Sequence, residues 1–178
     1  EDPELAAVVL ERLRAEGVTI HENSAVTRVE GGAGAVTVHH AGGRVDGSHL
    51  LVAVGRVPAI DDLGLEAAGI RATRAGITVD AGLRTTNRRV FAIGDAAGQG
   101  QFTHLAGYHA GIVVRSAVLG LPARVRTDHI PRATYTDPEL AQVGLTEAEA
   151  RRRLGAGVTV LRVPLSDNDR ARAKGIEA

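Results

Sequence analysis

The sequence of 178 residues contains no cysteine. No residue of this chain can therefore act as a redox dithiol, a thiolate nucleophile or a cysteine ligand of a metal ion. Methionine is also absent, even from the first position, and we therefore expect a fragment or a processed chain. No metal site is expected, because the histidines of the predicted strands, His39, His40 and His49, lack the spacing of metal ligands.

The low aromatic content and the balanced charge exclude further classes of partner. Aromatic residues make up 2% of the chain and the formal net charge is zero, whereas nucleic-acid-binding proteins present basic patches and stacking platforms. The longest apolar runs are far shorter than the roughly 20 residues that span a bilayer, and the chain does not begin like a secretory signal. We expect a cytoplasmic protein with neither a nucleic-acid nor a membrane partner.

The first part of the chain predicts a helix followed by an antiparallel meander. Asp2 and Pro3 are typical of a helix start, and Gly17 is typical of its end. The glycine-rich run Gly31–Gly34 lies between two strands, which favours a hairpin turn over a phosphate-binding loop. We expect strands at residues 18–20, 26–30, 36–38, around 45, and at 49–54, the last being apolar enough to be covered on both faces.

The rest of the chain predicts short strands and helices after a break at Gly55–Pro58. Thr146 and Glu149 form the pattern of a capping box, which predicts a helix to about Leu154 with the arginines 151–153 on its exposed face. We expect a helical turn at residues 63–70, a helix at about 105–119, and strands at 77–80, 83–85, 90–93, 134–136, 142–144 and 158–163. Residues 165–178 are polar and include Arg170 and Arg172, which we assign to a surface loop; contact with a substrate anion or a partner subunit is the alternative.

The apolar segment Val90–Ile93 ends in Gly94-Asp95, which places a carboxylate after a predicted buried strand. In open α/β sheets, ligands bind beyond the carboxyl ends of the strands. Glycine permits the close approach of a ligand to the backbone, and a carboxylate accepts hydrogen bonds from sugar hydroxyls. The helix that follows would present free N–H groups to an anion or an electron-rich ring. A turn-capping role for Asp95 is the alternative.

Three motifs resemble those of the pyridine nucleotide-disulfide oxidoreductases, the family of dihydrolipoamide dehydrogenase, glutathione reductase and mercuric reductase. The segment TTNRRVFAIGD at residues 85–95 resembles the family's second FAD-binding motif. LVAVGRVP at 51–58 is similar to its crossing between the NAD and FAD domains, and YTDPELAQVGLTE at 135–147 is similar to the opening of its dimerisation domain. The motifs follow the family's order and approximate spacing, and the resemblance covers essentially the whole chain.

The resemblance implies a mixed fold of α/β and α+β parts, in which a Rossmann-like FAD/NAD(P)-binding region precedes a dimerisation domain. Residues 1–57 would be the C-terminal half of an NAD(P)-binding domain. Residues 58–128 would be the C-terminal part of an FAD-binding domain, and residues 129–178 the start of an α+β dimerisation domain. It also implies a homodimer that uses FAD and NAD or NADP to reduce a small disulfide or metal-ion substrate.

Cofactor-binding roles follow from the resemblance by position. Asp95 would bind the ribityl and pyrophosphate region of FAD, with Gly94 beside it. The residues that would line the isoalloxazine are Gln101, Phe102, Thr103 and His104, and those that would approach NAD are Gly55 and Val26. The alternative for His104 is a helix-start side chain without a chemical role; for Val26 it is an ordinary strand residue, and for Gly55 a requirement of the tight crossing.

The family's remaining motifs are not in this sequence. We expect the first FAD fingerprint, the NAD-domain glycine motif and the redox-active cysteine pair before residue 1, and the acid/base His–Glu pair after residue 178. We therefore assign no catalytic residue to this chain and expect it to be inactive alone. An FAD/NAD-binding protein, or a relative of NADH oxidase without a redox dithiol, is the alternative for the whole protein.

Overall fold

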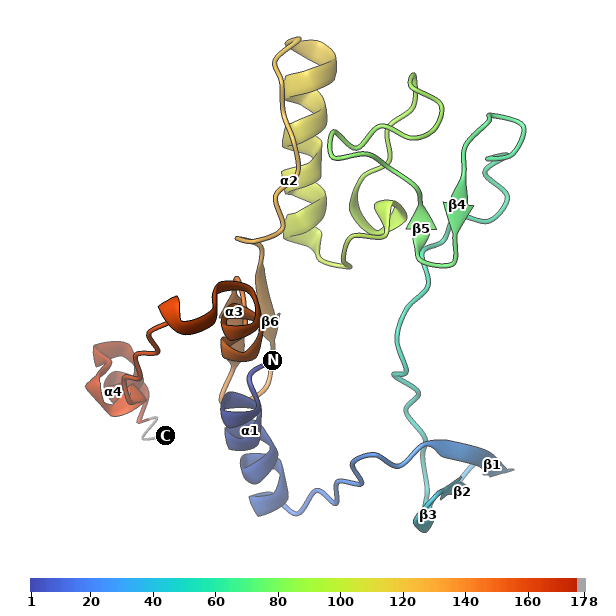
Figure 1. Cartoon of the computed structure of the whole chain (residues 1–178). Coiled ribbons are helices and arrows are strands. Elements are labelled where there is room, and N and C mark those ends of the chain that lie inside the picture. The colour runs from blue at the N-terminus through green and yellow to red at the C-terminus, as the bar shows by residue number, and fades with distance from the viewer. Residues whose placement is uncertain (176–178) are drawn as a thin grey trace. The chain divides into compact units, whose positions relative to one another are not determined.

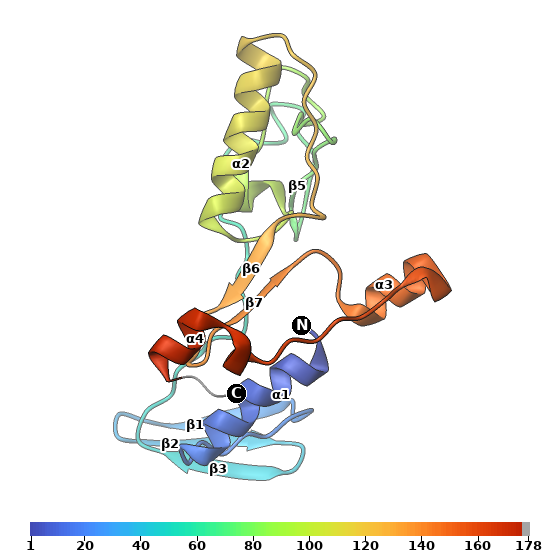
Figure 2. The ribbon, with the colours of Figure 1, turned by 90° about the vertical axis from the view of Figure 1, so that its left-hand side faces the viewer.

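The computed structural model describes residues 1–175, and the chain divides into two compact units. One unit comprises Glu1–Val54 together with Arg132–Ala178, and the other, which we call unit 2, comprises Gly55–Pro131. Each unit contains both helices and strands (Figures 1 and 2). Within residues 1–175, no helix is both long and apolar enough to cross a membrane.

The first unit begins with the predicted helix and meander. Helix α1 (Pro3–Ala15) starts with proline at its first turn, although the Asp2 side chain makes no capping hydrogen bond. The strands β1 (Val26–Gly32), β2 (Ala35–His40) and β3 (Gly43–Gly47) form an antiparallel sheet in the order β1-β2-β3, visible in Figure 2. The glycine-rich run Gly31–Gly34 overlaps the end of β1 and forms the hairpin connection to β2, as predicted.

Three of the predicted strands do not form among residues 1–175, namely those at 18–20, 49–54 and 158–163. The segment 49–54 runs without strand partners, and its side chains are exposed, 89% for Leu51 and 91% for Val54. An apolar or alternating sequence pattern indicates only that a segment is suited to a sheet. The strand itself forms through backbone hydrogen bonds to a neighbouring strand. The described residues provide no such neighbour for these three segments.

The C-terminal part of the first unit follows the prediction more closely. Strand β6 (Pro131–Thr134) pairs with β7 (Leu140–Val143). The predicted capping box is confirmed: Thr146 Oγ1 accepts from the Glu149 N–H at 3.2 Å, the Glu149 carboxylate accepts from the Thr146 N–H, and helix α3 (Glu147–Leu154) follows. Helix α4 (Asp169–Lys174) contains Arg170 and Arg172, which were expected in a loop, and residues 176–178 of that predicted segment lie outside the described part.

Unit 2 contains less regular sheet than the sequence predicts. A two-residue hairpin joins β4 (Ala72–Thr73) to β5 (Gly76–Ile77), and the predicted strands at 83–85 and 90–93 are reduced to an isolated bridge between Arg84 and Phe91. Their backbones still approach, since the Ala92 N–H donates to the Leu83 carbonyl at 3.1 Å. The helical turn expected at 63–70 is a series of hydrogen-bonded turns.

The core of unit 2 lies beneath helix α2 (Thr103–Val113), which continues as the π-helical turn η2 (Val114–Val118). Leu83, Leu105 and His109 are its largest fully buried side chains. The extended segment after α2 returns beside the helix (Figures 1 and 2), where the Tyr108 hydroxyl accepts from the Arg126 N–H at 3.0 Å. This hydrogen bond holds the returning segment against α2.

Candidate functional site

The Gly94-Asp95 segment is a tight turn rather than a strand end. Gly94 adopts the left-handed conformation with φ 58°, and the 3₁₀ turn η1 (Gly94–Ala97) begins there. The turn closes when the Gly98 N–H donates to the Asp95 carbonyl at 3.0 Å. Gly94 is buried and Asp95 is exposed, so the turn directs its one carboxylate away from the core.

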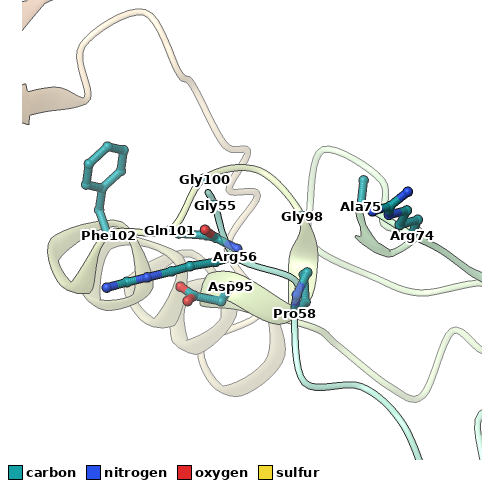
Figure 3. Close-up of a pocket in the computed structure, with 10 residues that line it drawn as sticks. All are labelled: Gly55, Arg56, Pro58, Arg74, Ala75, Asp95, Gly98, Gly100, Gln101 and Phe102. Atoms are coloured by element: carbon teal, nitrogen blue, oxygen red, sulfur yellow. The ribbon is translucent and has the colours of Figure 1, made fainter. Parts of the chain in front are cut away.

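A cavity of about 580 Å³ lies beside this turn, entirely within unit 2 (Figure 3). Its volume falls within the range of about 300–1,000 Å³ that is typical of small-molecule sites. The lining residues come from the start of the unit, the β4–β5 hairpin and the loop before α2, and they are Gly55, Arg56, Pro58, Arg74, Ala75, Asp95, Gly98, Gly100, Gln101 and Phe102. Four residues predicted from the sequence, Gly55, Asp95, Gln101 and Phe102, thus meet in one cavity.

Two glycines join the wall of the cavity to the hairpin. A Cβ atom at Gly98 would lie 2.4 Å from the Ala75 carbonyl oxygen, and one at Gly76 would lie 2.8 Å from the Ala96 carbonyl oxygen. Both residues have positive φ, 65° at Gly98 and 139° at Gly76. The hairpin turn and the η1 loop therefore touch backbone to backbone, which only glycine permits, and this contact brings Arg74 to the same cavity as Asp95.

Three charged side chains line the cavity, two arginines and one aspartate. Arg56, Arg74 and Asp95 are all exposed, and within residues 1–175 none of their side chains forms an ion pair. Figure 3 draws the side chains of Arg56, Asp95 and Gln101 among those that line this cavity. Guanidinium groups bind phosphate oxygens, and a carboxylate accepts hydrogen bonds from hydroxyls. The set therefore suits a ligand that carries both phosphates and a polyol, as a dinucleotide does.

The start of α2 adjoins the cavity through Phe102, which is one of the lining residues. Phe102 precedes the helix, and the Ala106 N–H donates to the Phe102 carbonyl at 3.1 Å as the first helical bond. The N–H groups of Thr103 and His104 come earlier than this bond and have no intrahelical acceptor. A helix of 11 residues also presents a partial positive charge at this end.

The remaining predicted residues are placed differently. The His104 ring is used within the protein, since its Nε2 lies 2.8 Å from the Pro131 carbonyl oxygen and its ring stacks on Phe102 with centroids 5.2 Å apart. Any contact of His104 with a ligand at the helix start would thus involve its backbone. Val26 opens strand β1 in the first unit, with 59% of its surface exposed, and does not line the cavity.

Sequence reasoning missed several residues of this site. Arg56 stands inside the recognised crossing motif, so its position already carried a signal. Arg74 carried none, because it reaches the cavity only through the folding of the hairpin onto Gly98. His109 was also missed: it is fully buried on α2, and its Nδ1 accepts from the Gly94 N–H at 3.1 Å. Burial lowers the pKa of His109 below its ordinary value of 6.5.

Comparison with family models matches two parts of the chain. Residues 1–110 match the model of the pyridine nucleotide-disulphide oxidoreductases, and residues 130–177 match the dimerisation domain of the same family. The matched residues include the cavity and the turn that carries Asp95.

Curated proteins and solved structures resemble the chain over nearly its whole length. It is 37% identical to a dihydrolipoyl dehydrogenase of Rhizobium etli over 98% of the chain, and 34% identical to a mercuric reductase of Bacillus cereus over 96%. An HOCl-induced flavoprotein disulfide reductase from Escherichia coli superposes on 99% of the chain with a TM-score of 0.85 and 34% identity. The chain spans 37%, 28% and 41% of these three proteins, respectively.

Proposed function

Because the chain belongs to the pyridine nucleotide-disulphide oxidoreductase family, with the mixed α/β fold expected of it, we propose that its unit 2 cavity binds part of FAD. The whole protein would then pass electrons from NAD(P)H through FAD to a disulfide or mercuric-type acceptor. The observation that carries the proposal is the convergence of Asp95, two arginines and the N-terminus of α2 on one cavity of about 580 Å³. FAD, when bound, supplies the redox chemistry.

Each group of the cavity has a distinct part in holding the cofactor. The Asp95 carboxylate accepts hydrogen bonds from the ribityl hydroxyls, and Arg56 and Arg74 offer charge to the pyrophosphate. The backbone N–H groups of Thr103 and His104 face the electron-rich pyrimidine end of the ring, where reduction adds negative charge. Gln101 and Phe102 cover the ring, and Gly94, which is buried and does not line the cavity, begins the turn that carries Asp95.

The parts of the chain outside the cavity complete the proposal. Residues 1–57 form the end of an NAD(P)-binding domain, in which Val26 approaches the nicotinamide nucleotide. Gly55, for which the resemblance implies the same role, lines the unit 2 cavity. Residues 58–128 belong to the FAD domain, and residues 129–178 begin a dimerisation domain through which the protein is a homodimer. The match of residues 130–177 to the family's dimerisation domain supports the last assignment. We also place the protein in the cytoplasm, where NAD(P)H is regenerated.

The identity of the electron acceptor depends on residues outside this cavity. The chain contains no cysteine, so a redox dithiol, if the protein has one, is supplied from outside the 178 residues. The named relatives include a dihydrolipoyl dehydrogenase and a mercuric reductase, whose acceptors differ. The alternative is a flavin-dependent NADH oxidase or an FAD/NAD-binding protein without a dithiol, and the cysteine content of the full-length protein distinguishes the two.

The test is the absorption spectrum of the full-length protein purified without added cofactor. A yellow protein with flavin bands, whose pigment is released by heat, is the expected result. Titration with NADH and with NADPH under argon should bleach these bands, and the faster nucleotide identifies the donor. Subsequent addition of a disulfide or of Hg²⁺ should restore them if the acceptor is of that class, whereas recovery with oxygen alone would favour the oxidase. A colourless protein with no extractable flavin would refute the proposal.

A further inference from the structure

The backbone of Gly94 has no strong conformational preference that would by itself fix the Asp95 turn. Glycine populates positive and negative φ about equally, so the observed φ of 58° must be selected by its surroundings. Two contacts from α2 reach this residue. A Cβ atom at Gly94 would lie 3.0 Å from the Ala106 Cβ, and the Gly94 N–H donates to Nδ1 of His109 at 3.1 Å.

Of these two contacts, only the hydrogen bond to His109 is polar, and both residues that form it are buried. The His109 side chain is 0% exposed, and Gly94 is buried as well. A buried backbone N–H that loses its acceptor is destabilised, because no water replaces the lost bond. Since Asp95 follows Gly94 directly, a rotation of Gly94 toward another acceptor would turn the Asp95 carboxylate away from the cavity.

We propose that His109 is a positioning residue for the cofactor: its Nδ1 holds the Gly94 amide and thereby aims Asp95 into the cavity. The inference rests on the proposed function for its ligand, while the contact itself stands on the geometry of the chain. His109 is not one of the residues that line the cavity. It acts through Gly94, from a position 15 residues further along the chain.

The contact requires one protonation state of the ring. Nδ1 can accept from the Gly94 N–H only if it carries no proton, so the neutral ring holds its hydrogen on Nε2. Nε2 is buried and has no hydrogen-bond partner among the described residues. Burial without a charged partner favours the neutral ring, which agrees with the lowered pKa of this group.

Two substitutions at residue 109 and one beside it separate positioning from general stability. His109→Asn retains an acceptor close to the place of Nδ1, whereas His109→Leu has a similar apolar bulk and no acceptor. Tyr108→Phe is the matched control, because it removes a different acceptor on the same helix, the hydroxyl that binds the Arg126 N–H. Each variant of the full-length protein is measured for its flavin dissociation constant, its melting temperature and the hydrogen exchange of the Gly94 amide.

The expected result is a flavin dissociation constant raised about tenfold or more in His109→Leu, with Gly94 exchange accelerated by a similar factor. His109→Asn should stay within about threefold of the wild type, and Tyr108→Phe should lower the melting temperature without weakening flavin binding. Equal weakening in His109→Leu and Tyr108→Phe, or unchanged Gly94 exchange in His109→Leu, would overturn the inference.

The ring tautomer gives a test that needs no variant to fold. Nitrogen NMR of the wild-type protein should show Nδ1 of His109 unprotonated and Nε2 protonated at neutral pH, and the reverse assignment would overturn the inference. If the wild-type protein takes up no flavin, the proposed function fails alone, since the tautomer and the Gly94 exchange still decide whether His109 holds the turn.

Discussion

The contact between the η1 loop and the β4–β5 hairpin predicts a large difference between two glycine substitutions. Gly98 and Gly120 share a φ of 65°, so a side chain at either position adopts the left-handed conformation. That conformation costs an L-residue about 1–2 kcal/mol. At Gly120 an added Cβ meets nothing within 4 Å, whereas at Gly98 it would lie 2.4 Å from the Ala75 carbonyl oxygen. Gly120→Ala therefore measures the backbone cost alone.

Gly98→Ala adds a steric cost to the same backbone cost. The obstructing atoms are backbone atoms of Ala75, which lie at 2.4 and 2.9 Å from the added Cβ and cannot rotate away. Overpacking of this kind costs about 1–3 kcal/mol, so the free energy of unfolding should fall by about 2–5 kcal/mol, against about 1–2 kcal/mol for Gly120→Ala. Urea unfolding followed by circular dichroism measures both. Equal losses in the two variants would refute the backbone-to-backbone contact that brings Arg74 to the cavity.

Three further results are expected. Thr146→Ala removes the capping box and should lower the free energy of unfolding by about 1 kcal/mol in the same urea assay, whereas Thr146→Ser should retain most of it. Asp80→Ala should cost about 1–2 kcal/mol, because Asp80 Oδ1 accepts from the N–H groups of Gly82 and Arg84 at 2.8 and 3.0 Å, and a melting temperature equal to that of the wild type would contradict this. Because the pKa of His109 is lowered in the folded protein, its contribution to stability is complete above the ordinary pKa of 6.5 and is lost as the pH falls through the lower folded pKa. Between these two pH values, the melting temperature of the wild type should therefore fall more than that of His109→Asn.

The elements that the sequence predicts well are those fixed by near neighbours. Helix α1, the β1–β2–β3 meander and the capping box at Thr146 depend on residues a few positions apart, and all of them form. The apolar segment 49–54 predicts a strand, but a strand also needs a hydrogen-bonded partner, which the described residues do not provide. The predicted strand at 90–93 survives only as the Arg84–Phe91 bridge for the same reason.

The candidate site shows the same division between local and distant information. Asp95 ends a recognised motif, Gln101 and Phe102 follow it closely in the sequence, and all three line one cavity. Arg74 comes from a hairpin whose sequence marks it only as a turn, and it reaches the cavity because Gly76 and Gly98 allow two backbones to touch. The contact of His109 with Gly94 likewise depends on the packing of α2, which no local sequence pattern predicts.

Flavin binding by Asp95→Ala tests the central claim most directly. The variant and the wild type are purified as full-length proteins, stripped of cofactor, and titrated with FAD while the melting temperature of each apo form is recorded. The account predicts a flavin dissociation constant raised by about tenfold or more, as for the loss of a hydrogen bond to a charged group, with a melting temperature close to that of the wild type, because the exposed carboxylate makes no ion pair among residues 1–175. Unchanged FAD affinity, or a loss of affinity matched by an equal loss of apo stability, would contradict it.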